Sequence, residues 1–247
     1  MKKVSLINLS ALILVATVFF SCKKSADVVP DSDTTIGKVI NVTKRTVVVI
    51  GSSTAAGYGA STIDSSWVSR LNSQLMANYQ TKVINLAVPG FTTYDVMPNG
   101  FVPGASRNAP KVANNITKAL SYNPDFVIIN LPSNDIALGY SDKEIMSNFD
   151  VLTGLLDSLQ VPYILTGTQP RNFADQAARD RLKTLDQLLN STYTTHVNDY
   201  YYQLNDSAGN LRSDVNSGDG IHPNNKGHRL IYESFFKFAL FLKLINT

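Results

Sequence analysis

Residues 46–50 read TVVVI and are followed by Gly51, and this stretch decides the fold of the chain. All five residues are β-branched, with no polar alternation, which is typical of a strand buried on both faces of a parallel sheet. Similar short apolar runs predict further strands. They lie at residues 82–86, 125–130, 161–166 and, in a shorter version, 195–198.

Helical patterns fill the intervals between these strands. Trp67, Leu71 and Leu75 recur at helical spacing and predict a helix with one apolar face. Ser141 and Glu144 have the spacing of a capping box, which indicates the start of another helix. The predicted helices cover residues 67–79, 112–120, 141–159, 174–189 and, in one piece, 225–245.

Strands and helices alternate along the chain, and no run of hairpins interrupts them. Because parallel strands need crossover helices, this order predicts a three-layer α/β/α sandwich, flavodoxin-like, around a central parallel sheet of about five strands. Ligands of such folds bind beyond the carboxyl ends of the strands. The places to search are therefore residues 51–59, 85–93, 131–135 and the loop before the last helix.

The first 21 residues are interpreted as an export signal and not as part of the fold. Two lysines precede a mostly apolar stretch at residues 6–20, which is too short for a comfortable membrane span. The stretch ends at Ser21 and Cys22, and this ending resembles a bacterial lipobox, in which the cysteine is lipidated. An ordinary secretory signal with an incidental cysteine is the alternative.

The rest of the chain divides into a polar tether at residues 22–44 and one folded domain at residues 45–247. A lipid on Cys22 would hold the exported domain on a membrane of the bacterial cell envelope. Cys22 is the only cysteine, so the sequence offers neither a disulfide nor a thiolate metal site. Without residues 1–21, which carry two lysines and no acid, the net charge falls from +3 to +1, and nucleic acid is not expected as a partner.

The loop after the first strand, GSSTAAGYG at residues 51–59, allows two interpretations. Small residues let the backbone turn tightly, so its N–H groups could cradle a phosphate. The same turn could present the hydroxyl of Ser53 as a nucleophile. The loop alone does not choose between them, although it lacks the glycine patterns of nucleotide-binding loops.

The loop before the last helix favours the nucleophile. Asp219 precedes His222 by three residues in a glycine-containing turn. A serine hydroxyl needs a base to remove its proton, and an imidazole works best when a carboxylate holds its other nitrogen. The other two histidines, His196 and His228, have no acid so placed before them.

Four blocks of this chain together resemble the SGNH (GDSL-like) hydrolase family. They are the GSST turn with Ser53, the NLAVPGFTT stretch with Gly90, the PSND stretch with Asn134, and the DGIH stretch with Asp219 and His222. The resemblance implies that Ser53 is the nucleophile, His222 its base and Asp219 the acid that orients the base. It also implies an oxyanion hole made by the N–H groups of Ser53 and Gly90 and the side-chain amide of Asn134, with no metal or cofactor.

The chain departs from the family's pattern at three positions. Ser52 stands where the family usually has aspartate, and Ala87 and Pro132 stand where it has glycine. None of these changes removes a catalytic group, so local tuning is expected. Asp135 is interpreted as a residue that caps or braces its loop.

The resemblance implies a carboxylic ester hydrolase that works through an acyl-enzyme. Because the chain is predicted to be exported and lipid-anchored, O-acetyl groups on a carbohydrate are the expected substrate. A lipolytic esterase, lysophospholipase or thioesterase of the same family is the alternative enzyme. A non-catalytic glycan- or cofactor-binding protein is the alternative of another class, and the Asp219–His222 pair argues against it.

Overall fold

The computed structural model describes residues 44–247. Its five-stranded sheet has the order β2-β1-β3-β4-β5, and every neighbouring pair is parallel. The predicted α/β fold and strand number are thereby confirmed. The strands are β1 (Arg45–Gly51), β2 (Thr81–Asn85), β3 (Phe126–Asn130), β4 (Tyr163–Thr166) and β5 (Val197–Asn198).

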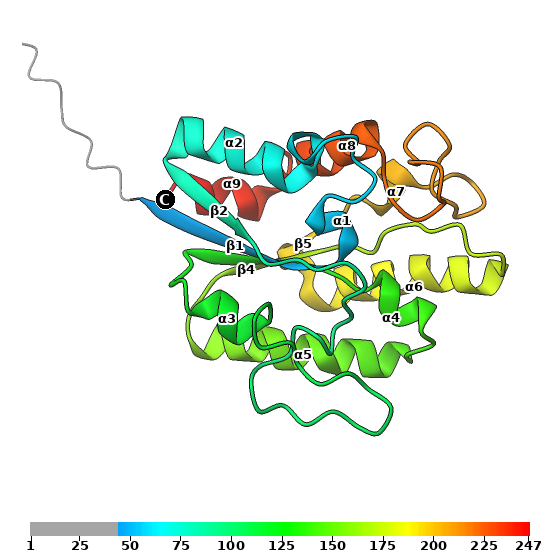
Figure 1. The fold of residues 1–247 in the computed structure, drawn as a ribbon, viewed down its shortest axis with the longest axis horizontal. Helices are drawn as coiled ribbons and strands as arrows, with labels where there is room; N and C mark the ends of the chain where they lie inside the picture. The colour runs from blue at the N-terminus through cyan, green and yellow to red at the C-terminus, as the bar shows by residue number, and fades with distance from the viewer. Residues whose placement is uncertain (1–43) are drawn as a thin grey trace, which may run out of the picture. The chain divides into compact units, whose positions relative to one another are not determined.

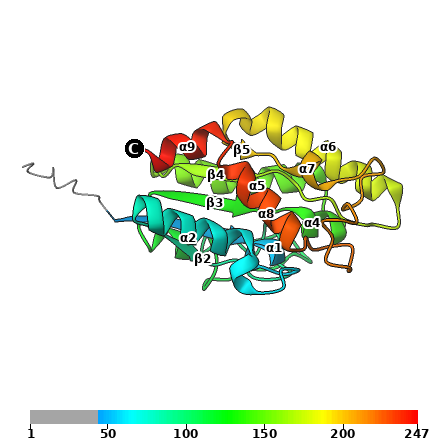
Figure 2. The ribbon, with the colours of Figure 1, turned by 90° about the horizontal axis from the view of Figure 1, so that it is seen from above.

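Two helical layers cover the two faces of this sheet (Figures 1 and 2). Alternate residues of β1 point to opposite cores: Val48 belongs to one apolar cluster and Val49 to the other, and both are fully buried. This explains why the strand shows no polar alternation. The helices on the Val48 side are α3 (Ile116–Leu120), α5 (Asp142–Ser158) and α6 (Gln176–Tyr193); those on the Val49 side are α2 (Trp67–Tyr79), α8 (Asn225–Phe235) and α9 (Ala239–Ile245).

Side-chain caps set several helix starts as the sequence predicts. The Ser66 hydroxyl accepts from the N–H of Ser69 and begins α2. Ser141 and Glu144 form a complete capping box at α5. Such caps satisfy N–H groups that have no partner inside the helix.

The prediction for residues 112–120 was too long, because α3 begins only at Ile116. The Asn115 side chain accepts from the N–H of Lys118 and donates to Asn99, so it caps the start of the helix. Val112 is 65% exposed, so little burial would be gained by extending the helix to include it.

The prediction of one continuous last helix was wrong, because α8 and α9 are separate. Phe238 between them has an extended backbone. The break turns Phe241 back over the sheet, where its ring packs against Phe126 at 6.1 Å and against Phe235 at 5.3 Å. Burial of these aromatic rings outweighs the local helical pattern.

Several short elements were not predicted. The most important are α1 (Ser53–Ala56) after β1 and α4 (Ser133–Ala137) after β3. Since β1 lies between β2 and β3, the chain changes direction in the sheet between β1 and β3, where open α/β sheets form their crevice. The others are the 3-10 helices η1 (Ile63–Ser65) and η2 (Thr194–His196) and the helix α7 (Tyr201–Leu204).

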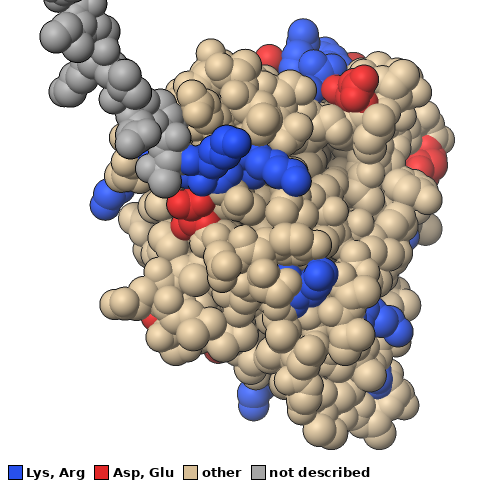
Figure 3. All heavy atoms as spheres, turned by 60° about the vertical axis from the view of Figure 1, so that its left-hand side comes forward, with Lys and Arg blue, Asp and Glu red and all other residues tan. Residues whose placement is uncertain are grey.

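The amino-terminal edge of the sheet lies away from that crevice. Lys and Arg side chains gather where the described chain begins (Figure 3), and Lys44, Arg45 and Lys82 help to line a hollow there. The predicted signal, tether and lipidation residue Cys22 lie outside the described residues. Within residues 44–247 no helix has the length and apolar character that a membrane crossing needs.

Candidate active site

Ser53 lies at the carboxyl end of β1, where the backbone turns from strand to helix. Gly51 pairs with Asn130 of β3, and a Cβ at Gly51 would come within 2.6 Å of the Asn130 carbonyl oxygen. The glycine therefore lets the two strands end close together. Ser53 is the first residue of α1, so its hydroxyl lies at the edge of the sheet as the sequence predicts.

The structure brings Ser53, His222 and Asp219 into one hydrogen-bonded chain. The Ser53 hydroxyl lies 2.8 Å from Nε2 of His222, and Nδ1 of His222 lies 2.6 Å from Oδ2 of Asp219. The carboxylate can only accept, so Nδ1 carries the proton and Nε2 is left to accept from the serine. This is the arrangement that a serine nucleophile and its base require.

Asp219 is held as a carboxylate. Burial raises its pKa, but the backbone N–H and ring of His222 and the N–H of Ile221 together bring the pKa well below its usual range. The other oxygen of Asp219 accepts both of these N–H groups at 2.8 Å. The acid is therefore ionised and fixed in direction, which suits a residue that orients an imidazole.

The loops that carry Ser53 and His222 lie close together, and a glycine allows this approach. Gly59 has a φ of +85°, and a Cβ there would lie 2.3 Å from the carbonyl oxygen of Pro223. The missing side chain at Gly59 therefore lets the loop after α1 approach the loop that carries His222. The ring of Tyr58 packs beside the ring of His222, with 5.6 Å between their centroids.

Two of the three predicted oxyanion donors are available. The backbone N–H of Ser53 begins α1 and has no acceptor within residues 44–247, as expected for the first turn of a helix. The N–H of Gly90 likewise has no acceptor in the described part of the chain. Gly90 is exposed and has a φ of +85°, which glycine adopts without strain.

The third predicted donor, Asn134, is engaged with the protein itself. Its Nδ2 donates to the Ser52 hydroxyl at 2.7 Å and to the Phe91 carbonyl oxygen at 3.0 Å. An amide has two N–H donors, so both are used. The amide therefore ties the serine loop to the Gly90 loop, and an oxyanion would have to replace one of these acceptors.

Asp135, in α4, braces the Gly90 loop from inside. It is completely buried and accepts from the backbone N–H and the hydroxyl of Thr93. Thr93 in turn accepts from the side chain of Asn148 on α5. Burial raises the pKa of Asp135 to about 7. These contacts agree with the bracing interpretation and place the carboxyl away from solvent.

A further loop, residues 167–173 after β4, belongs to the site, although no sequence motif predicted it. Gln169 is buried, accepts from the Thr54 hydroxyl at 2.6 Å and donates to the Ile221 carbonyl oxygen. Arg171 donates to Oδ1 of Asn134 at 3.3 Å. The rule that ligands bind at the carboxyl ends of strands would have found this loop if it had also been applied to β4.

The other histidines are structural. His228 is completely buried; Nδ1 accepts from the N–H of Trp67 and Nε2 donates to the Tyr58 carbonyl oxygen, so the ring is neutral. Burial lowers its pKa to about 4. His196 lies in η2, not in the predicted strand, and its ring stacks on Tyr163 at 4.6 Å.

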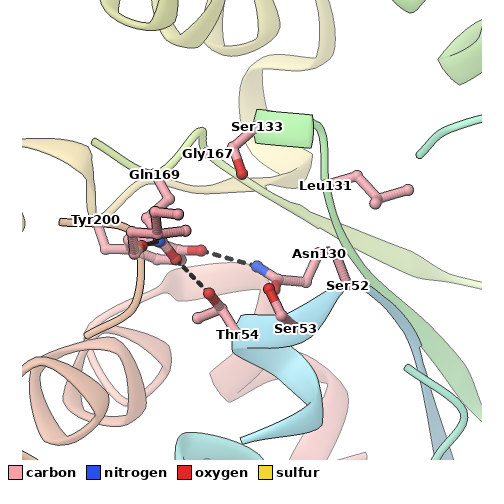
Figure 4. A pocket seen from close by; sticks show the side chains of 10 residues that line it. Ser52, Ser53, Thr54, Asn130, Leu131, Ser133, Gly167, Gln169 and Tyr200 are labelled. Carbon is pink, nitrogen blue, oxygen red and sulfur yellow. Dashed lines mark hydrogen bonds between the residues drawn. The ribbon is translucent and has the colours of Figure 1, made fainter. Parts of the chain in front are cut away.

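A small cavity of about 20 Å³ lies beside Ser53, which is room for about one water molecule. Figure 4 shows that its lining comes from the ends of several strands and that Thr54 bonds to Gln169 and Asn130 to Tyr200. Its walls carry hydroxyl and amide groups. The lining residues are Ser52, Ser53, Thr54, Asn130, Leu131, Ser133, Gly167, Gln169, Tyr200 and Ile221.

This site sits in a stretch that matches a known family model. The model of the GDSL-like lipase/acylhydrolase family matches residues 49–230, which contain Ser53, Gly90, Asn134, Asp219 and His222. The chain belongs to this family. It is accordingly a carboxylic ester hydrolase. No curated protein is significantly similar to it in sequence.

Solved structures of two esterases and a GDSL-like lipase share the fold. The psychrotrophic esterase EstA from Pseudoalteromonas sp. is 21% identical over 82% of this chain and 100% of its own, with a TM-score of 0.59. A GDSL-like lipase from Bacteroides thetaiotaomicron is 17% identical over 81% of this chain and 89% of its own, with a TM-score of 0.59. The acetyl xylan esterase AlAXEase is 14% identical over 78% of this chain and 99% of its own, with a TM-score of 0.58.

Proposed function

We propose that this GDSL-like hydrolase removes O-acetyl groups from carbohydrates by a Ser53–His222–Asp219 triad. The observation that carries the proposal is the hydrogen-bonded chain from Ser53 to Asp219 beside a small polar cavity. A triad of this geometry serves acyl transfer, and the cavity limits the acyl group.

The chemistry follows from the contacts of each residue. His222 takes the Ser53 proton through Nε2 as the serine oxygen attacks the ester carbonyl carbon, and Asp219 stabilises the imidazolium that forms. The tetrahedral oxyanion is met by the N–H groups of Ser53 and Gly90, with Asn134 as the third donor. The imidazolium then protonates the leaving alcohol. Water, activated by the same imidazole, releases the acid from the acyl-enzyme.

The size of the cavity beside Ser53 favours a short acyl group. A volume of about 20 Å³ accommodates a methyl-sized group and not an alkyl chain. Hydroxyl and amide groups in its walls would lose hydrogen bonds to water if an alkyl chain covered them. Both features support acetyl over a long acyl chain.

A second, larger hollow suits the alcohol part of the substrate. It measures about 470 Å³ and flanks the loop that carries Asp219 and His222. Six of its seven lining residues have polar side chains, which supports a sugar hydroxyl as a bound group. The lining residues are Gly59, Ser61, Asn216, Ser217, Asn224, Asn225 and Lys226.

The test combines active-site labelling with product release. Wild type should react with a fluorophosphonate probe and release acetate from an acetylated glycan such as acetylated xylan. Ser53→Ala should lose the label and about 10⁶-fold in kcat, since removing the nucleophile of a serine hydrolase costs about that much. Circular dichroism of the variant checks that it is folded. Unchanged turnover in Ser53→Ala would rule out the mechanism.

Chain-length profiling with p-nitrophenyl esters tests the acyl group. We expect kcat/KM to fall steeply from acetate to octanoate, because a longer chain has no cavity beside Ser53. A preference for octanoate or longer esters would instead favour the lipolytic alternative.

The proposal includes a lipid anchor at Cys22. The apolar stretch at residues 6–20 and the Ser21-Cys22 ending support it. Metabolic labelling with radioactive palmitate should mark wild type and not Cys22→Ser, and the label should follow the envelope membrane fraction. An unlabelled wild-type protein would contradict the anchor without affecting the esterase proposal.

A further inference from the structure

Arg171 brings a positive charge to the site. It lies in the loop after β4, and its Nη1 donates to Oδ1 of Asn134 at 3.3 Å. The amide of the same Asn134 reaches Ser52, next to the proposed nucleophile. The backbone N–H of the next residue, Asn172, donates to the Gly220 carbonyl oxygen at 2.8 Å. The guanidinium is therefore positioned near both the Asn134 side chain and the loop of the proposed triad.

In the described part of the chain, no carboxylate pairs with this guanidinium, in contrast to Arg107 and Arg181. Arg107 pairs with Glu144, and Arg181 lies 2.7 Å from Asp142. Within residues 44–247, no acidic oxygen lies within 4.0 Å of Arg171. A guanidinium has five N–H donors, and here a single long bond to a neutral amide oxygen uses one of them.

The nearby carboxylate of Asp219 does not form an ion pair with Arg171. Its Oδ2 is bonded to the ring of His222, and its Oδ1 accepts two backbone N–H groups. It still acts on Arg171 through space: burial lowers the pKa of Arg171, and Asp219 opposes that shift. Arginine stays protonated at neutral pH in such surroundings, so the site keeps a cation.

Packing holds the guanidinium in place while leaving donors free. Arg171 is half-buried, and its guanidinium lies 5.1 Å from the ring centroid of Phe173. No nitrogen of Arg171 is both buried and without a partner, so its remaining donors still reach solvent. A partly dehydrated cation with free N–H groups is well suited to bind an anion, because a charged acceptor replaces water with stronger bonds.

We propose that Arg171 binds a carboxylate carried by the ester substrate. The planar fork of a guanidinium matches the two oxygens of a carboxylate. This inference rests on the proposed function and narrows it: the substrate class is an O-acetylated acidic sugar, with the carboxylate on the alcohol part of the ester. A uronic acid unit has this chemistry.

The test uses two substrates that differ only in charge. One is an O-acetylated methyl galacturonoside, and the other is the same sugar with its carboxylate replaced by a carboxamide. We expect wild type to show a kcat/KM about 10- to 100-fold higher for the acid, the range of a charge-assisted hydrogen bond. Added salt should reduce this preference, because it screens the attraction between the two charges.

Arg171→Gln should lower kcat/KM for the acid much more than for the carboxamide and so lose most of the preference, since the neutral sugar makes no ion pair. Arg171→Lys should keep part of the preference, because it keeps the charge without the fork. Arg229→Gln is the matched control. This arginine pairs with Glu233 on α8, so its removal should leave kcat/KM unchanged for both substrates.

Each other outcome has a clear meaning. Equal losses on the acid and the carboxamide in Arg171→Gln would show that Arg171 only positions Asn134, and would overturn the inference. Equal kcat/KM values in wild type would overturn it as well while keeping the acetylesterase proposal. Release of acetate from neither sugar, with turnover of p-nitrophenyl esters, would instead overturn the carbohydrate substrate on which this inference rests.

Discussion

The two halves of the candidate site differ in whether their hydrogen bonds already have the arrangement that catalysis needs. In the half that carries Ser53, His222 and Asp219, each hydrogen bond already has the direction that catalysis needs. In the half that carries Gly90 and Asn134, the Asn134 amide donates to Ser52 and Phe91, so neither of its N–H groups is free for an oxyanion. One half is assembled in the free enzyme, and the other has to exchange a partner.

This difference has a physical reason. The imidazole and the carboxylate attract each other without substrate, so they form their contact in the resting state. The oxyanion exists only in the transition state, so the proposed side-chain donor, Asn134, bonds to neutral oxygens until then. A charged oxygen is a stronger acceptor than a hydroxyl and can replace Ser52. The unusual serine at position 52 thus links the two halves.

The largest effect should come from breaking the assembled half at its acid. Asp219→Asn should lower kcat about 10⁴-fold, because an amide no longer fixes the tautomer and charge of the base. Steady-state kinetics on p-nitrophenyl acetate measures the loss. Asp175→Asn, which changes the exposed cap residue of α6 to another good cap residue, serves as the control and should keep full activity. A loss below about 10-fold would show that Asp219 is not the triad acid.

A smaller loss is expected from the other half. Asn134→Ala should lower kcat about 10²- to 10³-fold, the usual cost of one oxyanion donor, with little change in KM. The split between kcat and KM is the informative readout, since a donor used only in the transition state leaves substrate binding intact. Unchanged kcat would mean that Asn134 keeps its resting partners throughout the reaction.

A buried neutral histidine, His228, lies behind the assembled half, where it donates to the carbonyl oxygen of Tyr58 beside His222. The ordinary pKa of a histidine is 6.5, and that of His228 in the folded protein is about 4. The unfolded chain therefore takes up this proton first as the pH falls. Stability should be full above pH 6.5 and decline toward pH 4 by about 3 kcal/mol from this residue.

Urea unfolding at several pH values tests this expectation on the same half of the site. His228→Gln, which keeps one donor and one acceptor, should be less stable than wild type at pH 7 and show a smaller decline between pH 6.5 and 4. An equal decline in both proteins would assign the acid sensitivity to other groups.

The smallest effect is expected at the link between the halves. Ser52→Ala removes a neutral hydroxyl that accepts from Asn134 and should change kcat by less than about 5-fold, the worth of one neutral hydrogen bond. Ser52→Asp restores the residue common in the family and should hold Asn134 more tightly. A large loss in Ser52→Ala, similar to that of Asn134→Ala, would show that the hydroxyl itself takes part in catalysis.

Local patterns predicted most of the fold because they report burial. The β-branched run in β1, the capping box at α5 and the alternation of strands and helices all arise from residues close in sequence. The prediction failed where distant packing decided the outcome, as at Phe238, where rings of α8, α9 and β3 break an otherwise helical pattern.

The sequence by itself determined the parallel sheet and predicted Ser53, Asp219 and His222 as site residues. A serine, a base and an acid in one family pattern indicate nucleophilic catalysis. Only the tertiary structure decided which groups these residues meet. Thr54 and Gln169 are 115 positions apart, and Asn134 and Arg171 are 37 apart. No local pattern records such contacts, because they arise when parallel strands bring their carboxyl ends to one edge. The proposed role of Ser53 therefore comes from the sequence, and its surroundings, including the charge of Arg171, come from the fold.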